Sequence, residues 1–289
     1  MFEAINSPYL VEFDEPFKLK DRATTPPASE LNKKDFKKKL ETSILKLDEL
    51  QQTLFANQKY SVLFIFQAMD AAGKDGTIRA VMSGVNPAGC DVISFRQPTE
   101  HELDHDFLWR TTLCLPERGK IVIFNRSYYE EVLIVRVHPE FLEKQKMPWK
   151  IDLQNVWQER FESIVNHEKH LAENGTVIVK FFLHLSKGEQ KKRFLSRIDE
   201  PDKNWKFTVS DVAERKYWDD YMNAYEKAIG ATSRPWAPWY AIPADDKPYM
   251  RYCVADIIVA TLKSLGLTYP RINSHEQKAL LEMRKLLEK

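Results

Sequence analysis

The chain has 289 residues, enough for one large α/β domain or about two ordinary domains. Hydrophobic residues make up 43% and charged residues 29%, which excludes a disordered or fibrous chain. The formal net charge is only +1, so the protein lacks the general positive field that draws proteins onto nucleic acid. A polyanionic ligand would have to be held by locally concentrated charge.

The N-terminus and the cysteines predict a cytoplasmic protein. The first five residues lack the charged-then-apolar layout of a signal peptide. The most apolar late stretch, Tyr252 to Leu262, is interrupted by Asp256 and is shorter than the ~20 residues of a spanning helix, so we expect no membrane span. Three scattered cysteines favour reduced thiols over a disulfide framework: Cys90, Cys114 and Cys253.

Residues 1–32 are predicted to form an extended arm on the body, because they contain four prolines and few periodic apolar positions. From Lys33 to Phe55, apolar residues recur at helical spacing and predict an amphipathic helix. These apolar residues are Phe36, Leu40, Ile44, Leu47, Leu50 and Leu54. A second amphipathic pattern, from His275 to Leu287, predicts a C-terminal helix within residues 271–289 that packs on the body or on a second subunit.

Short β-rich runs alternate with helical patterns in the main part of the chain. The runs cover residues 60–66, 91–95, 120–124, 176–185 and 239–242. Their nearly continuous apolar character predicts strands buried on both faces. The alternation predicts an α/β fold with a parallel sheet flanked by helices. Helix starts are indicated at Thr99, Ser186 and Thr208, each followed three residues later by an acid.

The most informative segment follows the first strand and opens a helix. It matches the phosphate-loop pattern G-x-x-x-x-G-K-[ST] in register at Gly73 and Lys74, whereas Ala68 replaces the first glycine and Asp75 the hydroxyl residue. Asp70 adds a second carboxylate. A loop that holds two aspartates beside phosphate groups predicts a divalent cation. The alternative is an ordinary strand-to-helix turn with a surface lysine.

A second polar cluster follows the third strand. The residue that ends this strand in phosphate-loop enzymes is usually a metal-binding aspartate, and here it is Asn125. Arg126 leaves the strand at the carboxyl edge, where open α/β sheets bind ligands, so it suits a bidentate grip on phosphate. A surface ion pair is the alternative for this arginine.

The segment from Ser186 to Lys216 gathers positive charge. Arg193 and Arg197 are four residues apart, so on a helix they share one face. The alternative is an exposed helix whose charges are balanced by nearby acids. The basic residues are Lys187, Lys191, Lys192, Arg193, Arg197, Lys203, Lys206, Arg215 and Lys216.

Four motifs together resemble the polyphosphate kinase 2 family. They are Ala68–Gly76, Leu103–Arg110, Asn125–Glu131 and Trp236–Tyr240, and the similarity runs in order from about Lys33 to Leu267. The resemblance implies a three-layer, thymidylate-kinase-like P-loop fold over residues 33–270, with a helical lid at about residues 186–216. It also implies phosphoryl transfer between inorganic polyphosphate and a nucleotide with Mg²⁺, or Mn²⁺ in its place. Asn125 and Glu130 resemble the subgroup that accepts both AMP and ADP.

The resemblance also implies roles for individual residues. Asp70, Lys74 and Arg126 would be catalytic, with Asp70 the metal ligand. Arg193 and Arg197 would contact polyphosphate from the lid. The further binding residues would be Ala71, Ala72, Gly73, Asp75, Gly76, Asp104, Arg110, Asn125, Glu130, Arg136 and Lys192. The implied partners are polyphosphate, adenine nucleotides with guanine nucleotides as a second candidate, and further copies of the chain in a dimer or tetramer.

Three other functions compete with this interpretation. A P-loop nucleotide kinase that uses ATP as donor would share the fold and most of the chemistry. A non-catalytic polyphosphate-binding protein is disfavoured, because Asp70, Lys74 and Arg126 together suit transfer. The run His101–His105 fits H-E-x-x-H, which on a helix binds zinc in metallopeptidases, although no x-x-G-x-x-H follows it.

Overall fold

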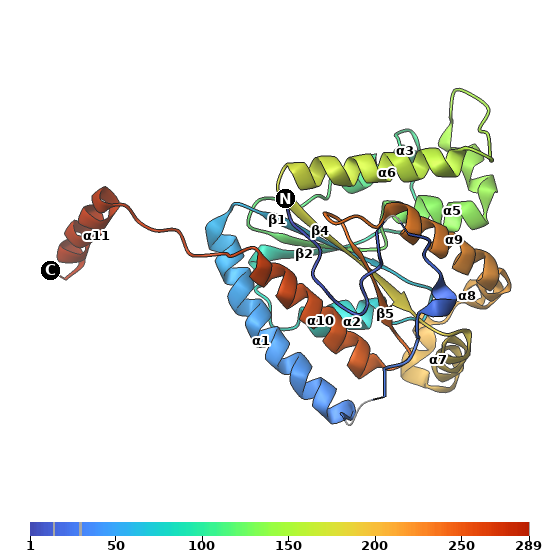
Figure 1. Cartoon of the computed structure of the whole chain (residues 1–289), viewed down its shortest axis with the longest axis horizontal. Coiled ribbons are helices and arrows are strands. Elements are labelled where there is room, and N and C mark those ends of the chain that lie inside the picture. Colours follow the sequence, from blue (N-terminus) through green and yellow to red (C-terminus); the bar gives the residue numbers. More distant parts are fainter. Residues whose placement is uncertain (14, 29–30, 289) are drawn as a thin grey trace.

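Parallel strands form a single sheet at the centre of the molecule (Figure 1). The computed structural model describes residues 1–13, 15–28 and 31–288. The strands are β1 (Ser61–Gln67), β2 (Cys90–Ser94), β3 (Ile121–Asn125), β4 (Thr176–His184) and β5 (Trp239–Pro243). Their order is β2-β3-β1-β4-β5, and all neighbouring strands pair in parallel. Each predicted run overlaps one of these strands to within one residue at either end, so the predicted parallel sheet is confirmed.

Burial of the strands follows their position in the sheet. All seven residues of β1 are buried, as are the first four of β3, because helices cover both faces of these central strands. The prediction of full burial is wrong for β2, where Asp91, Val92 and Ser94 are exposed. This strand lies at the edge of the sheet, where fewer helices cover it.

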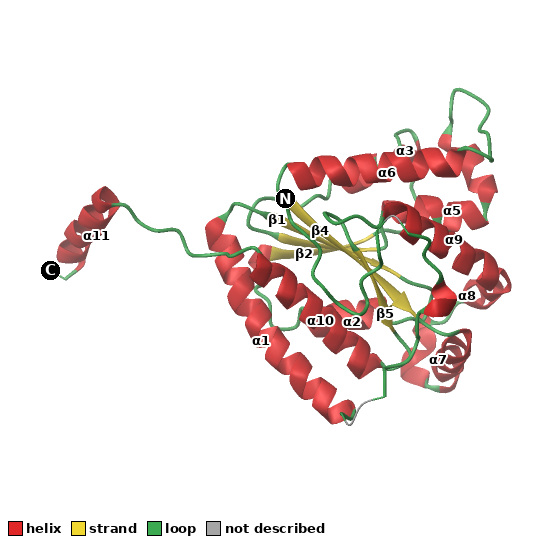
Figure 2. Ribbon diagram, viewed as in Figure 1, coloured by secondary structure: helices red, strands yellow, loops and turns green. Residues whose placement is uncertain are grey.

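Helices cover the two faces of the sheet in separate layers (Figures 1 and 2). One face packs against α1 (Lys33–Asn57), α2 (Lys74–Val81) and α10 (Lys247–Ser264), and the other against α6 (Val156–Glu173) and α9 (Trp218–Thr232). The apolar positions predicted for α1 are confirmed, since Phe36, Leu40, Leu47 and Leu54 are buried. The result is a three-layer α/β architecture with a separate apolar core on each side of the sheet.

The remaining helical elements are α-helices and 3₁₀ turns. The α-helices are α3 (Glu100–Leu103), α4 (Trp109–Thr112), α5 (Ile134–Val137), α7 (Lys187–Asp199), α8 (Val209–Glu214) and α11 (Ser274–Leu287). The 3₁₀ turns are η1 (Leu19–Asp21), η2 (Pro87–Gly89), η3 (Tyr128–Val132), η4 (Pro139–Gln145), η5 (Pro201–Lys206) and η6 (Arg215–Tyr217). The predicted starts are confirmed: Thr99, Ser186 and Thr208 each accept a bond from the backbone N–H three residues later.

The N-terminal arm covers the outer edge of β5. The N–H of Val11 donates to the carbonyl of Trp239, and the N–H of Ala241 donates to the carbonyl of Tyr9, both at 2.9 Å. These bonds run antiparallel to the otherwise parallel sheet. The arm therefore satisfies backbone groups that an open edge would leave exposed.

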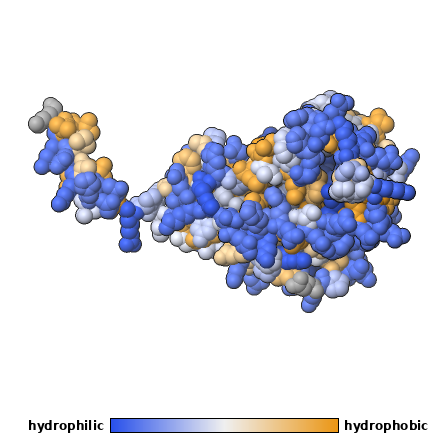
Figure 3. Space-filling view, turned by 90° about the horizontal axis from the view of Figure 1, so that it is seen from above, coloured by the Kyte–Doolittle hydropathy of each residue, from blue (hydrophilic) through white to orange (hydrophobic). Residues whose placement is uncertain are grey.

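The C-terminal helix α11 stands apart from the body at the end of an extended segment (Figure 1). None of its described residues is buried, and Figure 3 shows apolar side chains on its surface. Leu280, Met283 and Leu287 are among those exposed. In the described part of the chain no helix is long and apolar enough to cross a membrane, and the apolar stretch 252–262 lies in α10 instead.

A buried ion pair joins β4 to α6. Lys180 of β4 donates from Nζ to a carboxylate oxygen of Glu168, to the hydroxyl of Tyr129 at 3.0 Å and to the carbonyl of Thr232 at 2.9 Å. Tyr128 and Tyr129 each donate a hydroxyl to the other oxygen of Glu168 at 2.9 Å. Burial lowers the pKa of Lys180 to about 8, although Glu168 opposes the shift. This network fixes the segment that follows β3.

Replacing Lys180 by Met should lower the free energy of unfolding by about 3–5 kcal/mol, because Glu168 would remain buried without its counter-ion. The double variant Lys180→Met/Glu168→Gln should recover much of this loss, because Gln is neutral and its oxygen can accept the tyrosine hydroxyls. Urea unfolding of the wild type, both single variants and the double variant measures the interaction energy between Lys180 and Glu168. If the stability losses of the two single variants simply add in the double variant, this interaction is absent.

Candidate active site

The phosphate loop, residues 68–73, connects β1 to α2. Gly73 has φ +99° and precedes the first turn of α2, a conformation that a Cβ would strain. Ala71 has φ +61°, which is uncommon for a residue with a side chain. The Nζ of Lys74 donates to the carbonyl of Ala68 at 2.8 Å, so the lysine folds back across the loop. Burial lowers the pKa of Lys74, and the positive charge of Arg126 lowers it further.

Arg193 of α7 binds the carbonyl groups of this loop. Its Nη1 donates to the carbonyls of Ala71 and Ala72, at 3.1 and 2.8 Å. Its Nη2 donates to the carbonyls of Ala244 and Asp245, at 2.7 and 3.2 Å. The Nε donates to Glu189 at 3.0 Å. All of its donor nitrogens are used within the protein.

The expectation that Arg193 presents its charge to polyphosphate is therefore corrected. The side chain is buried, and the loop backbone takes the place of an external anion. Gln190, one turn earlier on α7, is also buried and donates to the carbonyl of Asp70 at 2.9 Å. Gln190 was not among the predicted site residues, because nothing in the sequence marks a helical glutamine as a partner of the loop.

Arg126 joins the phosphate loop to the segment after β3. Its Nη2 lies 3.2 Å from Oδ1 of Asp70, and its Nη1 lies 3.3 Å from Oε2 of Glu130. Arg126 has φ +64°, held by the bond from its N–H to the carbonyl of Phe66 at 3.1 Å. Glu130, and to a lesser degree Asp70, raises the pKa of Arg126, so the guanidinium stays charged. The structure thus brings Asp70, Arg126 and Glu130 together.

Asp70 of the loop, Asp75 of α2 and Asn125 of β3 carry oxygen atoms of the kind that Mg²⁺ binds. The Nδ2 of Asn125 donates to Oδ1 of Asp75 at 2.6 Å and to the Ser94 hydroxyl at 3.3 Å. Mg²⁺ in phosphate-transfer sites usually takes one or two carboxylates and completes its octahedron with water and phosphate oxygens. Asp70, Asp75 and the amide oxygen of Asn125 fit that requirement.

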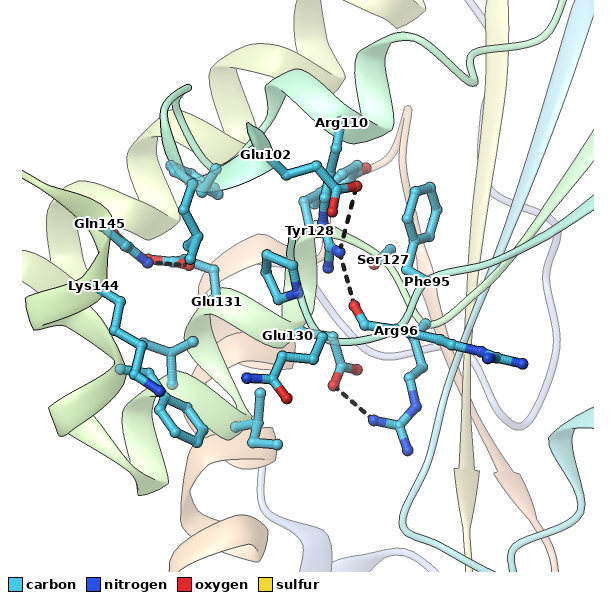
Figure 4. A pocket seen from close by; sticks show the side chains of 18 of the residues that line it. Phe95, Arg96, Glu102, Arg110, Ser127, Tyr128, Glu130, Glu131, Lys144 and Gln145 are labelled. Carbon is cyan, nitrogen blue, oxygen red and sulfur yellow. Dashed lines mark hydrogen bonds and ion pairs between the residues drawn. The ribbon is translucent and has the colours of Figure 1, made fainter. Parts of the chain in front are cut away.

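A cavity of about 230 Å³ opens beside Arg126, at the carboxyl ends of β2 and β3 (Figure 4). Arg110 and Phe95 lie on one side of it, and Glu131 and Gln145 on the other. The apolar lining includes Leu103, Phe107, Ile134, Val135 and Phe141. Arg126 and Glu130 also line the cavity, so it opens directly onto the phosphate loop's ion pairs. Charged side chains are spread around this apolar lining, among them Arg110, Glu131 and Lys144. A pocket that combines apolar and charged walls suits a nucleotide base and its phosphates.

Arg110 is held at the wall of this pocket by three contacts. Its Nη1 donates to the carbonyl of Arg96 at 2.8 Å and lies 3.9 Å from Oε1 of Glu102. Its guanidinium stands 5.4 Å from the ring centre of Phe95. The predicted binding residue Arg110 therefore faces the same cavity as Glu130.

The opposite wall is fixed by a cluster that was not predicted. Gln145 of η4 donates to both oxygens of Glu131 at 2.9 Å, and Arg160 of α6 lies 3.2 Å from Glu131 and donates to Gln145. Burial raises the pKa of Glu131, although Arg160 opposes the shift. These three residues are far apart in sequence, so no spacing signal could have grouped them.

Four predicted binding residues lie outside this arrangement. Asp104 forms an exposed ion pair with Lys146. Arg136 stands over the rings of Trp157 and Phe161 instead of lining the pocket, and it has a buried Nη1 without a hydrogen-bond partner. The remaining two are Lys192, which is 80% exposed, and Arg197, which pairs with Asp211 at 3.2 Å.

The H-E-x-x-H pattern does not lie on one helix. α3 ends at Leu103, so His105 lies beyond it. The His105 ring stacks on Trp109 with a centroid distance of 3.8 Å, and its Nδ1 lies 2.9 Å from the carbonyl oxygen of His101. Within residues 1–13, 15–28 and 31–288, no group of three or more His, Cys, Asp or Glu residues is arranged to hold a metal ion. The geometry does not support a zinc peptidase.

Comparisons with known proteins identify the family of this chain. The family model Polyphosphate kinase 2 (PPK2) matches residues 30–267. A relative from Rhodopseudomonas palustris, named ADP-polyphosphate phosphotransferase, is 56% identical over 257 residues, which are 89% of each chain. A relative from Meiothermus ruber, named AMP/ADP-polyphosphate phosphotransferase, is 48% identical over 237 residues, which are 82% of this chain and 85% of that protein.

The fold agrees with a solved structure as well. The crystal structure of polyphosphate kinase 2 from Arthrobacter aurescens TC1 superposes with a TM-score of 0.86 and 36% sequence identity. The match covers 97% of this chain and 99% of that chain. The expected three-layer α/β kinase fold with a P-loop-like turn is thereby confirmed, and the chain belongs to the polyphosphate kinase 2 family.

Proposed function

We propose that this protein transfers phosphoryl groups between inorganic polyphosphate and AMP or ADP. The observation that carries the proposal is the position of Arg126, which pairs with Asp70 of the phosphate loop and also lines the apolar pocket. One guanidinium thus contacts both the phosphate loop and the pocket. We call these two parts the half-sites, which a phosphoryl transfer has to bring together. The names of the relatives supply the donor and the acceptors.

The pocket suits the acceptor nucleotide, and the phosphate loop suits the transferring group. The apolar side chains would enclose the base, while Arg110 and Arg126 would hold the acceptor's phosphates. Lys74 and the N–H groups at the start of α2 would bind oxygens of the transferring phosphate. The terminal phosphate of AMP or ADP is largely ionised near neutral pH, so the acceptor needs no strong general base. Positioning and charge neutralisation are then the main tasks of these residues.

Asp70, Asp75 and Asn125 would hold Mg²⁺, with Mn²⁺ as the alternative. A bound divalent cation would supply positive charge to the phosphate oxygens. Because Asn125 is neutral, this metal would be bound by fewer carboxylates than in a site with aspartate at the end of β3. Asp70 would also orient Arg126, with which it already pairs.

The remaining expectations are part of the same proposal. Adenine nucleotides, with guanine nucleotides as second candidates, would be the substrates in the cytoplasm, and nucleic acid would not be a partner. Residues 186–216 would act as the lid, and Arg197 and Lys192 remain candidates for contacts with polyphosphate from its outer surface. The exposed apolar face of α11 supports a homo-oligomer, a dimer or a tetramer.

The donor is tested by incubating the protein with Mg²⁺ and AMP, together with either polyphosphate or ATP. We expect ADP, followed by ATP, with polyphosphate as the phosphate source, because the family assignment points to that donor. Chromatography of the nucleotides reads the result. If products form from AMP only when ATP is the donor, the protein is a conventional nucleotide kinase. If no product forms with either donor, it is a binding protein.

Lys74→Ala should lower kcat/KM by roughly 10²–10³-fold, because the lysine would bind the transferring phosphate most strongly in the transition state. Steady-state kinetics with AMP and polyphosphate measures the loss. Lys37→Ala, which removes an exposed lysine of α1, is the matched control and should keep wild-type turnover. Near-wild-type activity of folded Lys74→Ala would remove this lysine from the mechanism.

Arg193→Lys should both destabilise the protein and reduce kcat, because one ammonium group cannot bond four carbonyls at once. Leaving two or more buried carbonyls unpaired should cost about 2–3 kcal/mol. The adjacent variant Lys192→Gln alters an exposed cation and should change stability by less than about 0.5 kcal/mol. Thermal unfolding of both variants, with kinetics of Arg193→Lys, distinguishes positioning of the loop from a surface charge effect. Equal losses of stability in the two variants would contradict the assigned role of Arg193.

A further inference from the structure

The second part of the N-terminal arm crosses the carboxyl ends of β4 and β5 (Figure 1). Thr24 of the arm forms two hydrogen bonds with Asp245, which lies in the turn after β5. The Thr24 hydroxyl donates to Oδ2 of Asp245 at 2.8 Å, and the N–H of Asp245 donates to the carbonyl of Thr24 at 2.9 Å. This attachment is separate from the bonds of Tyr9 and Val11 along β5, and it lies at the edge of the sheet that carries the phosphate loop.

His184, the last residue of β4, contacts the same part of the arm. Its side chain is buried. Burial lowers the pKa of His184, whereas Asp245 and a hydrogen bond with the backbone of Ala23 oppose this shift. Two consecutive residues of the arm, Ala23 and Thr24, thus contact the segments that leave β4 and β5.

Asp245 also fixes the start of α7. Its Oδ1 accepts from the backbone N–H of Ser186 at 2.8 Å, while its Oδ2 accepts from Thr24. The Ser186 hydroxyl in turn caps α7 by accepting from the N–H of Glu189 at 3.0 Å. One carboxylate therefore joins the arm to the first turn of this helix.

The next turn of α7 binds the phosphate loop. Gln190 and Arg193 donate to the carbonyls of residues 70–72, at distances between 2.8 and 3.1 Å. Arg193 also donates to the carbonyl of Asp245 at 3.2 Å. A displacement of the start of α7 would move both of these donors. A continuous series of hydrogen bonds thus runs from Thr24 through Asp245 and α7 to the loop.

We infer that Thr24 and Asp245 are positioning residues of the phosphate loop, so that the N-terminal arm is part of the transfer machinery. The inference rests on the proposed function for the role of the loop. Neither residue lines the acceptor pocket, so both would act through α7. Protection of the sheet edge explains the bonds of Tyr9 and Val11, but not those of Thr24, because Asp245 lies past the end of β5. Phosphoryl transfer is sensitive to small displacements of the groups that hold the transferring phosphate.

The test compares Thr24→Val with Thr25→Val, which alters the adjacent, exposed threonine and is the matched control. Valine keeps the shape of threonine but lacks the hydroxyl. Thr24→Val should lower kcat by ~10-fold and Asp245→Ala by ~10²-fold, because the loop would lose its alignment. KM for AMP should stay within about twofold, since the acceptor pocket is untouched. Thr24→Ser should restore most of kcat, and Thr25→Val should behave as wild type.

Amide hydrogen exchange gives a second measurement that needs no activity. It is followed on peptides that contain residues 68–76 and 184–193. Exchange in both peptides should be at least ~5-fold faster in Thr24→Val and Asp245→Ala than in the wild type, because local opening becomes easier. Thr25→Val should leave it unchanged. Thermal unfolding of each variant ensures that folded proteins are compared, and Thr24→Val carries the test if Asp245→Ala does not fold.

Wild-type kcat and wild-type exchange in folded Thr24→Val would overturn the inference and leave the proposed function standing. Equal losses in Thr25→Val would also overturn it, because the effect would then be a general loosening of the arm. A Thr24→Ser variant as impaired as Thr24→Val would reject the role of the hydroxyl. If the wild type uses only ATP, the proposed function fails, whereas kcat with ATP and the exchange of the loop still decide the inference.

Discussion

The shape of the phosphate loop depends on one buried guanidinium. Arg193 bonds the carbonyls of Ala71 and Ala72 in the loop and those of Ala244 and Asp245 in the turn after β5. A loop that points its N–H groups at an anion has to point carbonyls the other way, and those carbonyls need donors of their own. A buried arginine supplies several donors in a fixed plane. It therefore stabilises a loop backbone that has positive φ at Ala71.

The sheet brings the two half-sites together. Pairing of β1 with β3 aligns Phe66 with Asn125, so the phosphate loop and Arg126 leave the sheet at the same edge. Arg126 can then pair with carboxylates from both segments. Each carboxylate takes a hydrogen bond from a different nitrogen of the guanidinium. An arginine has five N–H donors, so Arg126 can be oriented by Asp70 and Glu130 and still offer donors to phosphate oxygens.

The sequence predicted the fold well, because apolar runs and helix caps are local signals. Asp70, Lys74, Asn125, Arg126 and Glu130 lie close to one another in the structure, since β1 and β3 are neighbours and their carboxyl ends meet at the same edge of the sheet. Burial of charged side chains was the property that it could not supply. Arg193 and Arg197 have the same residue type and share a helix face by spacing, yet Arg193 is a buried partner of the loop and Arg197 forms a partly buried ion pair with Asp211. The cluster of Glu131, Gln145 and Arg160 unites three separate elements, which only tertiary packing reveals.

The N-terminal arm connects the first residues of the chain to its last strand. Its bonds join Tyr9 and Val11 to the main chain of β5, across more than two hundred residues. Contacts at such sequence separation form late, because the intervening chain has to close first. During synthesis the arm leaves the ribosome before β5, the strand on which it docks. Until the two pair, the arm and the edge of β5 are both available for pairing with other chains.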